Sequence, residues 1–121
     1  HQPRRQRQMC IRDRVKEARN RWQEFLSAFK KSSSAGTDRF IVKAEFREGA
    51  KCEYMWLSVT EASLRSFSGV LMNDPHELLD VHRGTSVTLE LDKLNDWIFQ
   101  DEDGEHIGGF TLDVLAEGDD E

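Results

Sequence analysis

The pattern of hydrophobic residues begins with a helical period. Between residues 15 and 31, apolar side chains recur at spacings of three and four, and charged side chains occupy the positions between them. This pattern predicts one amphipathic helix over residues 15–31. Residues 32–38 read SSSAGTD, a run of small and polar side chains that ends the periodicity and predicts a linker.

After the linker the period changes to two, which is typical of half-buried strands. Strands are predicted at residues 40–46, 52–59, 64–71, 87–91 and 94–99, with a short return at 105–107. Strands outnumber helices and no strand–helix–strand alternation is present, so the fold class is α+β. We expect one curved, mostly antiparallel sheet of about five to six strands with the N-terminal helix packed on it.

Two short helices are predicted within and after the sheet. One covers residues 75–81, because Asp74 can cap it and Pro75 suits its first position. The other covers residues 110–116. The predicted α+β domain therefore spans residues 39–116, and the acidic residues 117–121 are expected to be a disordered tail.

A single hydrophobic core is expected between the N-terminal helix and the sheet. Its expected members are Trp22, Phe25, Phe29, Phe40, Val42, Trp56, Val87, Leu89 and Ile98.

Composition places the chain among soluble proteins of one domain. It has 121 residues, of which 37% are hydrophobic and 33% charged. No stretch approaches the roughly 18 apolar residues that a membrane span needs. Two cysteines are too few for a disulfide scaffold, so a reduced, cytoplasmic compartment is the default.

Residues 1–14 are interpreted as a leader that does not belong to the native protein. The chain begins with His1, and residues 4–13, RRQRQMCIRD, are what one reading frame of a widely used sequencing adapter encodes. Without this leader the chain loses five arginines and one aspartate, and its net charge moves from −6 to about −10. Such acidity argues against nucleic-acid binding and favours a basic protein surface or peptide as partner. The native N-terminus would then be missing, which leaves export open.

The order of several short motifs resembles a bacterial family. These motifs are Phe40–Val42–Lys43, Glu53–Tyr54–Met55–Trp56, Phe67–Ser68–Gly69, Asn73–Asp74–Pro75, Gly84, Asp96–Trp97 and Gly108–Gly109–Phe110–Thr111. Together they are similar to the bacterial domain-of-unknown-function 2314 family, also called YegJ-like, over about residues 38–115. The resemblance implies a bacterial origin and a self-contained domain. It carries over no catalytic residues, since the family has no established activity.

Glu53 and Asp96 are the two acids that could carry catalysis, although no catalytic residue is assigned. Each lies beside a tryptophan on a predicted strand, and two carboxylates in one cleft can act as acid and base. In the competing interpretation, Glu53 faces solvent and Asp96 accepts hydrogen bonds from a backbone turn. The two differ in whether both carboxyls face one pocket.

A ligand surface, if one exists, is predicted around strand ends and tryptophans. Its candidate residues are Trp97, Asp96, Asn73, Asp74, His76 and Trp56. Trp56 and Trp97 could form an aromatic wall, but large aromatic residues on strands are more often part of the core.

Metal, cofactor and nucleophile chemistry find little support in the sequence. His76 and His82 are six residues apart, a spacing that does not place them on one helical face. A calcium loop with Gly104 at its sixth position would require ligands from Phe99 at the first position and Phe110 at the twelfth, and a phenylalanine cannot ligate calcium. We therefore predict no metal and no cofactor.

The favoured function is a non-enzymatic module that binds a protein or another ligand. One alternative is a small enzyme using Glu53 and Asp96 as an acid–base pair. Another is a structural appendage of a longer protein.

Overall fold

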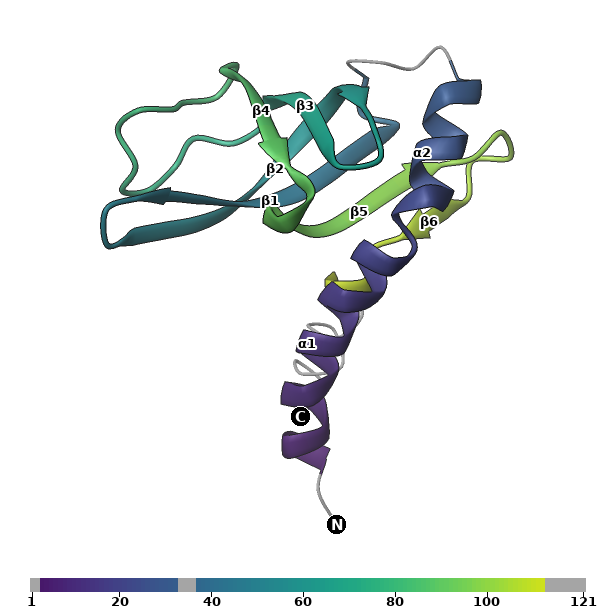
Figure 1. The fold of residues 1–121 in the computed structure, drawn as a ribbon, viewed down its shortest axis with the longest axis horizontal. Helices are drawn as coiled ribbons and strands as arrows, with labels where there is room; N and C mark the ends of the chain where they lie inside the picture. The colour runs from purple at the N-terminus through teal and green to yellow at the C-terminus, as the bar shows by residue number, and fades with distance from the viewer. Residues whose placement is uncertain (1–2, 33–36, 113–121) are drawn as a thin grey trace.

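The N-terminal part of the chain forms two consecutive helices. The computed structural model describes residues 3–32 and 37–112, with side chains from residue 12 onward. Helix α1 spans Pro3–Asn20 and α2 spans Trp22–Lys31, so two helices occupy the span where one was predicted (Figure 1). They are separated at Arg21, whose backbone φ of −102° and ψ of 15° depart from helical values.

Two tryptophan side chains explain why the helix breaks there. In a continuous helix, the Ala18 carbonyl would accept the N–H of residue 22. Instead, Trp97 Nε1–H donates to the Ala18 carbonyl at 2.7 Å. Trp22 Nε1–H donates to the Ser63 carbonyl at 2.8 Å. Tertiary hydrogen bonds therefore fix the ends of both helices on the sheet.

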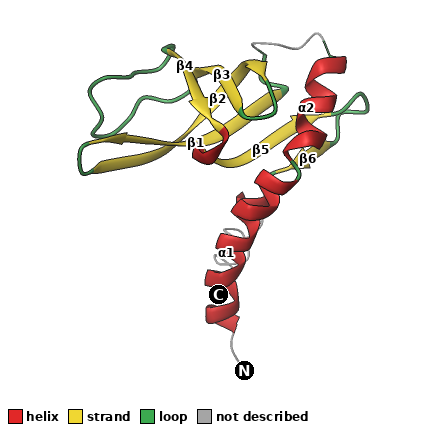
Figure 2. Ribbon diagram, in the orientation of Figure 1, coloured by secondary structure: helices red, strands yellow, loops and turns green. Residues whose placement is uncertain are grey.

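One sheet of six strands follows the helices, which confirms the predicted fold class (Figure 2). Its strands are β1 (Phe40–Glu48), β2 (Lys51–Ala62), β3 (Ser66–Leu71), β4 (Ser86–Glu90), β5 (Leu94–Gln100) and β6 (His106–Gly108), with a 3-10 turn, η1, at Leu91–Lys93. Their spatial order is β4-β3-β2-β1-β5-β6, and all neighbouring strands are antiparallel. The strands twist relative to one another, so the sheet curves (Figure 1).

The core lies between the helices and one face of this sheet. Trp22 stacks on Phe25 with ring centroids 4.9 Å apart, and Phe25 contacts Phe40 and Trp97. Of the expected core, Trp22, Phe25, Phe40 and Val42 are buried, and Phe29, Val87 and Leu89 pack against them. Trp56 and Ile98 are only half-buried. The prediction that Trp56 and Ile98 belong to the core is wrong. They lie on the opposite face of their strands, because they alternate with Met55, Leu57 and Trp97, which are buried in the core.

The helix predicted at residues 75–81 is not formed. This segment belongs to a long, irregular loop between β3 and β4, because its backbone N–H groups bond to side chains outside the loop. The helix predicted at 110–116 is present in its first residues, 110–112, and the remainder lies outside the described residues. The predicted tail at 117–121 also lies outside them.

Candidate functional site

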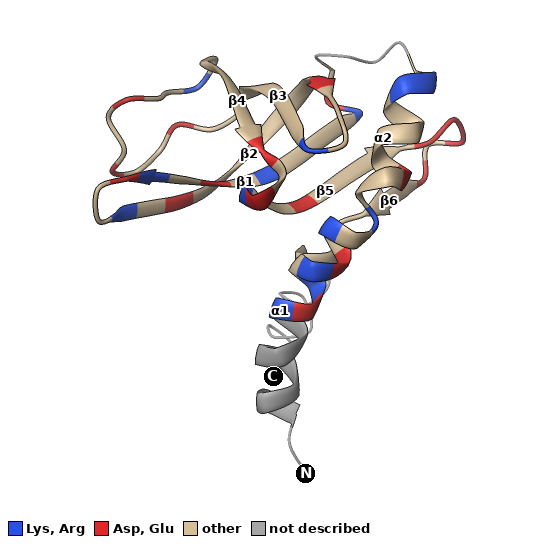
Figure 3. Cartoon of the chain, viewed as in Figure 1, with Lys and Arg blue, Asp and Glu red and all other residues tan. Residues whose placement is uncertain are grey.

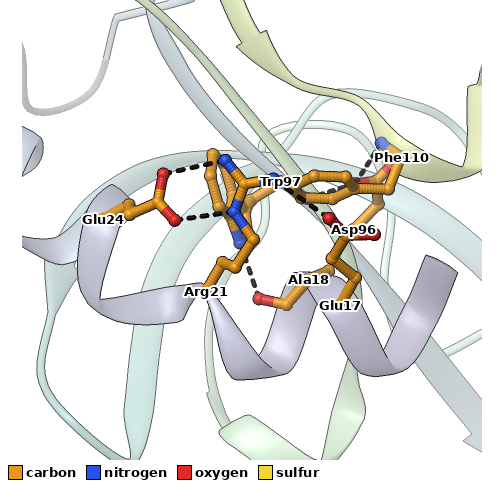
Figure 4. Close-up of polar contacts among 7 residues, drawn as sticks. All are labelled: Glu17, Ala18, Arg21, Glu24, Asp96, Trp97 and Phe110. Carbon is orange, nitrogen blue, oxygen red and sulfur yellow. Dashed lines mark hydrogen bonds and ion pairs between the residues drawn. The ribbon is translucent and has the colours of Figure 1, made fainter. Parts of the chain in front are cut away.

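Asp96 is a fully buried carboxylate on β5 that accepts four hydrogen bonds. Its Oδ1 accepts the backbone N–H groups of Trp97 at 2.8 Å and Phe110 at 3.1 Å (Figure 4). Its Oδ2 accepts the N–H of Thr111 at 3.0 Å and the Thr111 hydroxyl at 2.7 Å. These contacts fix the start of the last helical turn on the sheet, as a capping residue does.

Trp97 is also completely buried, so its ring offers no surface to a ligand. Phe110 meets it edge-on, with ring centroids 5.1 Å apart. Gly108 lies so close that a Cβ there would stand 2.2 Å from the Trp97 carbonyl oxygen and 2.7 Å from its ring. Only glycine fits this contact, and the close approach contributes to the burial of Trp97.

Arg21, at the break between the helices, covers this buried region from outside. Its guanidinium carbon lies 5.0 Å from the centre of the Phe110 ring, and its nitrogens bond to Glu17 and Glu24 (Figure 4). These hydrogen bonds raise the pKa of Arg21 above its ordinary value, and the bond to Glu24 contributes more than the bond to Glu17. Arg21 in turn lowers the pKa of Glu24. The region is thus closed by a structural ion-pair cluster.

Glu53, on β2, accepts hydrogen bonds from a different segment. Its Oε1 accepts the N–H of His76 at 2.9 Å. Its Oε2 accepts the N–H groups of Glu77 at 2.7 Å and Leu78 at 3.3 Å. The hydrogen bonds from the His76 and Glu77 N–H groups lower the pKa of the Glu53 carboxyl, because they stabilise its charged form. The bond from His76 contributes most.

Glu48, at the end of β1, continues the same row of contacts. It accepts the N–H of Leu79 through Oε1 and that of Asp80 through Oε2, both at 2.8 Å. Five consecutive backbone N–H groups, residues 76–80, therefore bond to two carboxylates from the β1–β2 hairpin. Residues 72–85 are called the anchored loop below. Sequence reasoning missed Glu48, because a glutamate before a Gly-Ala turn gives no signal of such a contact.

The structure does not bring Glu53 and Asp96 into one cleft. β1 separates their strands, and along it Glu53 pairs with Phe46 whereas Asp96 pairs with Lys43. Their carboxylates bond to residues 76–78 and to residues 97 and 110–111, respectively. This arrangement lacks the shared pocket that an acid–base pair requires.

The other candidate residues gather at the anchored loop. Asn73, Asp74 and His76 are exposed there, and half-buried Trp56 adjoins them on β2. Asn73 Oδ1 accepts the N–H of Trp56 at 3.4 Å, and Asp74 Oδ1 accepts the N–H of Arg83 at 3.0 Å. The loop therefore holds three of the six predicted ligand-binding residues and adjoins a fourth, Trp56, while Asp96 and Trp97 lie elsewhere in the interior.

Two surface grooves lie away from these residues. One, of about 740 Å³, runs between α2 and the acidic turn at 101–103, which Figure 3 shows between β5 and β6. The other, of about 370 Å³, lies between α1 and the sheet and includes Tyr54 and Lys93. None of the six ligand-binding candidates lines either groove. Among the residues that the structure describes, no three His, Cys, Asp or Glu side chains are grouped as metal ligands.

A family model described as an uncharacterized protein conserved in bacteria, DUF2314, matches residues 8–119. The chain belongs to this family. The resemblance predicted from the order of short motifs is thereby confirmed, and the bacterial family assignment with it. The match begins within the predicted leader, whose origin stays a prediction.

The chain spans only part of the length of two relatives that it matches. The chain is 29% identical to "Uncharacterized protein YegJ" of Escherichia coli K12 over 106 residues, which cover 88% of the chain and 67% of YegJ. It is 34% identical to "Putative ankyrin repeat protein NMB1133/NMB1171" of Neisseria meningitidis serogroup B over 98 residues, 78% of the chain and 38% of that protein. No solved structure matches the chain. Within the described residues, no helix is both long and apolar enough to cross a membrane.

Proposed function

We propose that this DUF2314 domain is a non-enzymatic module that binds a protein partner through the anchored loop and the adjoining Trp56. The observation that carries the proposal is that the acidic candidate residues accept backbone hydrogen bonds from loops. Asp96, Glu53 and Asp74 all accept backbone hydrogen bonds, so their carboxylates serve to fix loops. A carboxylate that fixes a loop is poorly placed to exchange protons with a substrate.

The loop has the properties of a binding surface on a rigid scaffold. It is exposed at Asn73, Asp74 and His76, yet its backbone N–H groups bond to Glu53 on β2 and Glu48 on β1. Binding residues are concentrated on loops of this kind. The relative named as an ankyrin repeat protein supports a role in protein interaction, because repeat proteins of that class use extended binding surfaces.

The proposal is tested by chemical crosslinking of the tagged, full-length protein in its bacterial host. We expect a discrete adduct with another protein, and a double variant, Asn73→Ala with His76→Ala, should lose it. Glu61→Ala, an exposed change at the far end of β2, is the matched control and should keep the adduct. Absence of any adduct, or equal yield from the double variant, would contradict the proposal.

A further inference from the structure

Leu79 is the most exposed large hydrophobic residue that the structure records, with 85% of its surface open to solvent. An exposed leucine alone is ordinary. Leu79 differs because the chain on both sides of it is fixed. Leu78 is buried at 5% exposure, and Val81 packs against the core. Glu53 accepts the N–H of Leu78, and Glu48 accepts those of Leu79 and Asp80.

This arrangement keeps the Leu79 side chain in solvent. Folding the loop inward to bury it would break hydrogen bonds to two carboxylates. A side chain on a backbone that is already ordered loses less conformational entropy when a partner covers it. Leu79 is therefore preorganised to enter a pocket of another molecule.

The charges around Leu79 indicate the chemistry of that pocket. Glu77 and Asp80 are exposed on either side of it, and neither forms an ion pair within the described part of the chain. Two uncompensated carboxylates beside an apolar side chain complement basic residues around an apolar pocket.

We propose that Leu79 is the central contact of the interaction surface, and that its partner is a folded protein with an apolar pocket rimmed by lysine or arginine. This inference rests on the proposed function and adds the contact residue and the partner's chemistry. Glu77 and Asp80 meet the rim while Leu79 fills the pocket. Energetic centres of interfaces take this form, with an apolar side chain in a desolvated pocket surrounded by polar contacts.

The test places photoreactive benzoylphenylalanine in the full-length protein in its host, as Leu79→benzoylphenylalanine or, for the control, Leu64→benzoylphenylalanine. Leu64 is also exposed, at 59%, but lies beyond the opposite end of β2. We expect an adduct with a second protein from position 79 and none from position 64. In unsubstituted protein, a carbodiimide should couple Glu77 or Asp80 to lysines of that same protein.

The partner identified by crosslinking is then purified and its affinity for the domain is measured. Leu79→Ala should weaken this binding by about 30-fold or more, the loss typical of a central interface residue. Its melting temperature should not change, because the side chain is exposed. If the chemical crosslinking described for the proposed function gives an adduct while position 79 gives no photoadduct, the inference fails and the proposed function stands. The same conclusion follows if Leu79→Ala binds normally. If position 79 crosslinks only to a second copy of this chain or to lipid, the partner chemistry is wrong. If neither experiment gives an adduct, both proposals fail.

Discussion

At the scale of single residues, the same chemical group performs one task repeatedly. Asp96, Glu53 and Glu48 each place a carboxylate against backbone N–H groups of a segment that would otherwise be loosely held. Charge-assisted hydrogen bonds of this kind are stronger than neutral ones. The three acids lie on central strands, so they attach the irregular parts of the chain to its most ordered part.

Replacing Asp96 with asparagine should lower the free energy of unfolding by about 1–3 kcal/mol. The amide keeps one acceptor oxygen but turns an NH₂ group toward buried donors of residues 97, 110 and 111. Chemical denaturation of the purified protein measures the change. Asp92→Asn, an exposed aspartate in the neighbouring turn, is the control and should be nearly neutral. A normal unfolding curve for Asp96→Asn together with lost function would instead favour a catalytic or binding acid.

At the scale of elements, the anchored loop shows where sequence reasoning succeeds and where it ends. The strands around it follow from alternation of apolar residues, and the five main ones lie close to their predicted positions. The loop carried local helix signals at Asp74 and Pro75, but Glu48 and Glu53 outcompete them from distant positions in the sequence. Local propensity cannot report an acceptor that another strand supplies.

The attachment of this loop should depend on pH in a defined direction. Hydrogen bonds hold the pKa of Glu53 below its ordinary value of 4.5, so its contribution to stability is fully present above that value. The contribution is lost as pH falls through the lowered, folded-state pKa. Amide resonances of residues 76–78 followed by NMR should therefore shift with a midpoint below 4.5. Glu53→Gln should remove this transition, whereas the control Glu61→Gln should preserve it. A midpoint above 4.5 would show that the hydrogen bonds from residues 76–78 to Glu53 do not form.

At the scale of the whole molecule, the fold class was accessible from sequence because periodicity reports which face of each element is buried. The assignment of tryptophans was harder. Trp97 follows Asp96 on β5 and Trp56 lies three residues after Glu53 on β2, yet Trp97 is fully buried and Trp56 is half-buried. The difference depends on which strand face the helices cover, and a single sequence does not record it.

The helices are expected to contribute to stability only from about residue 15 onward. Trp22 is 2% exposed and bonds to Ser63, so Trp22→Ala should cost about 3–5 kcal/mol. Deletion of residues 1–14 should change the unfolding free energy by less than ~0.5 kcal/mol, because the predicted adapter origin of this segment implies that it was never selected to pack on this domain. Denaturant titrations of the two variants beside the full chain provide the comparison. A deletion that costs more than ~1 kcal/mol would show that this segment packs on the domain, and would contradict its interpretation as a foreign leader.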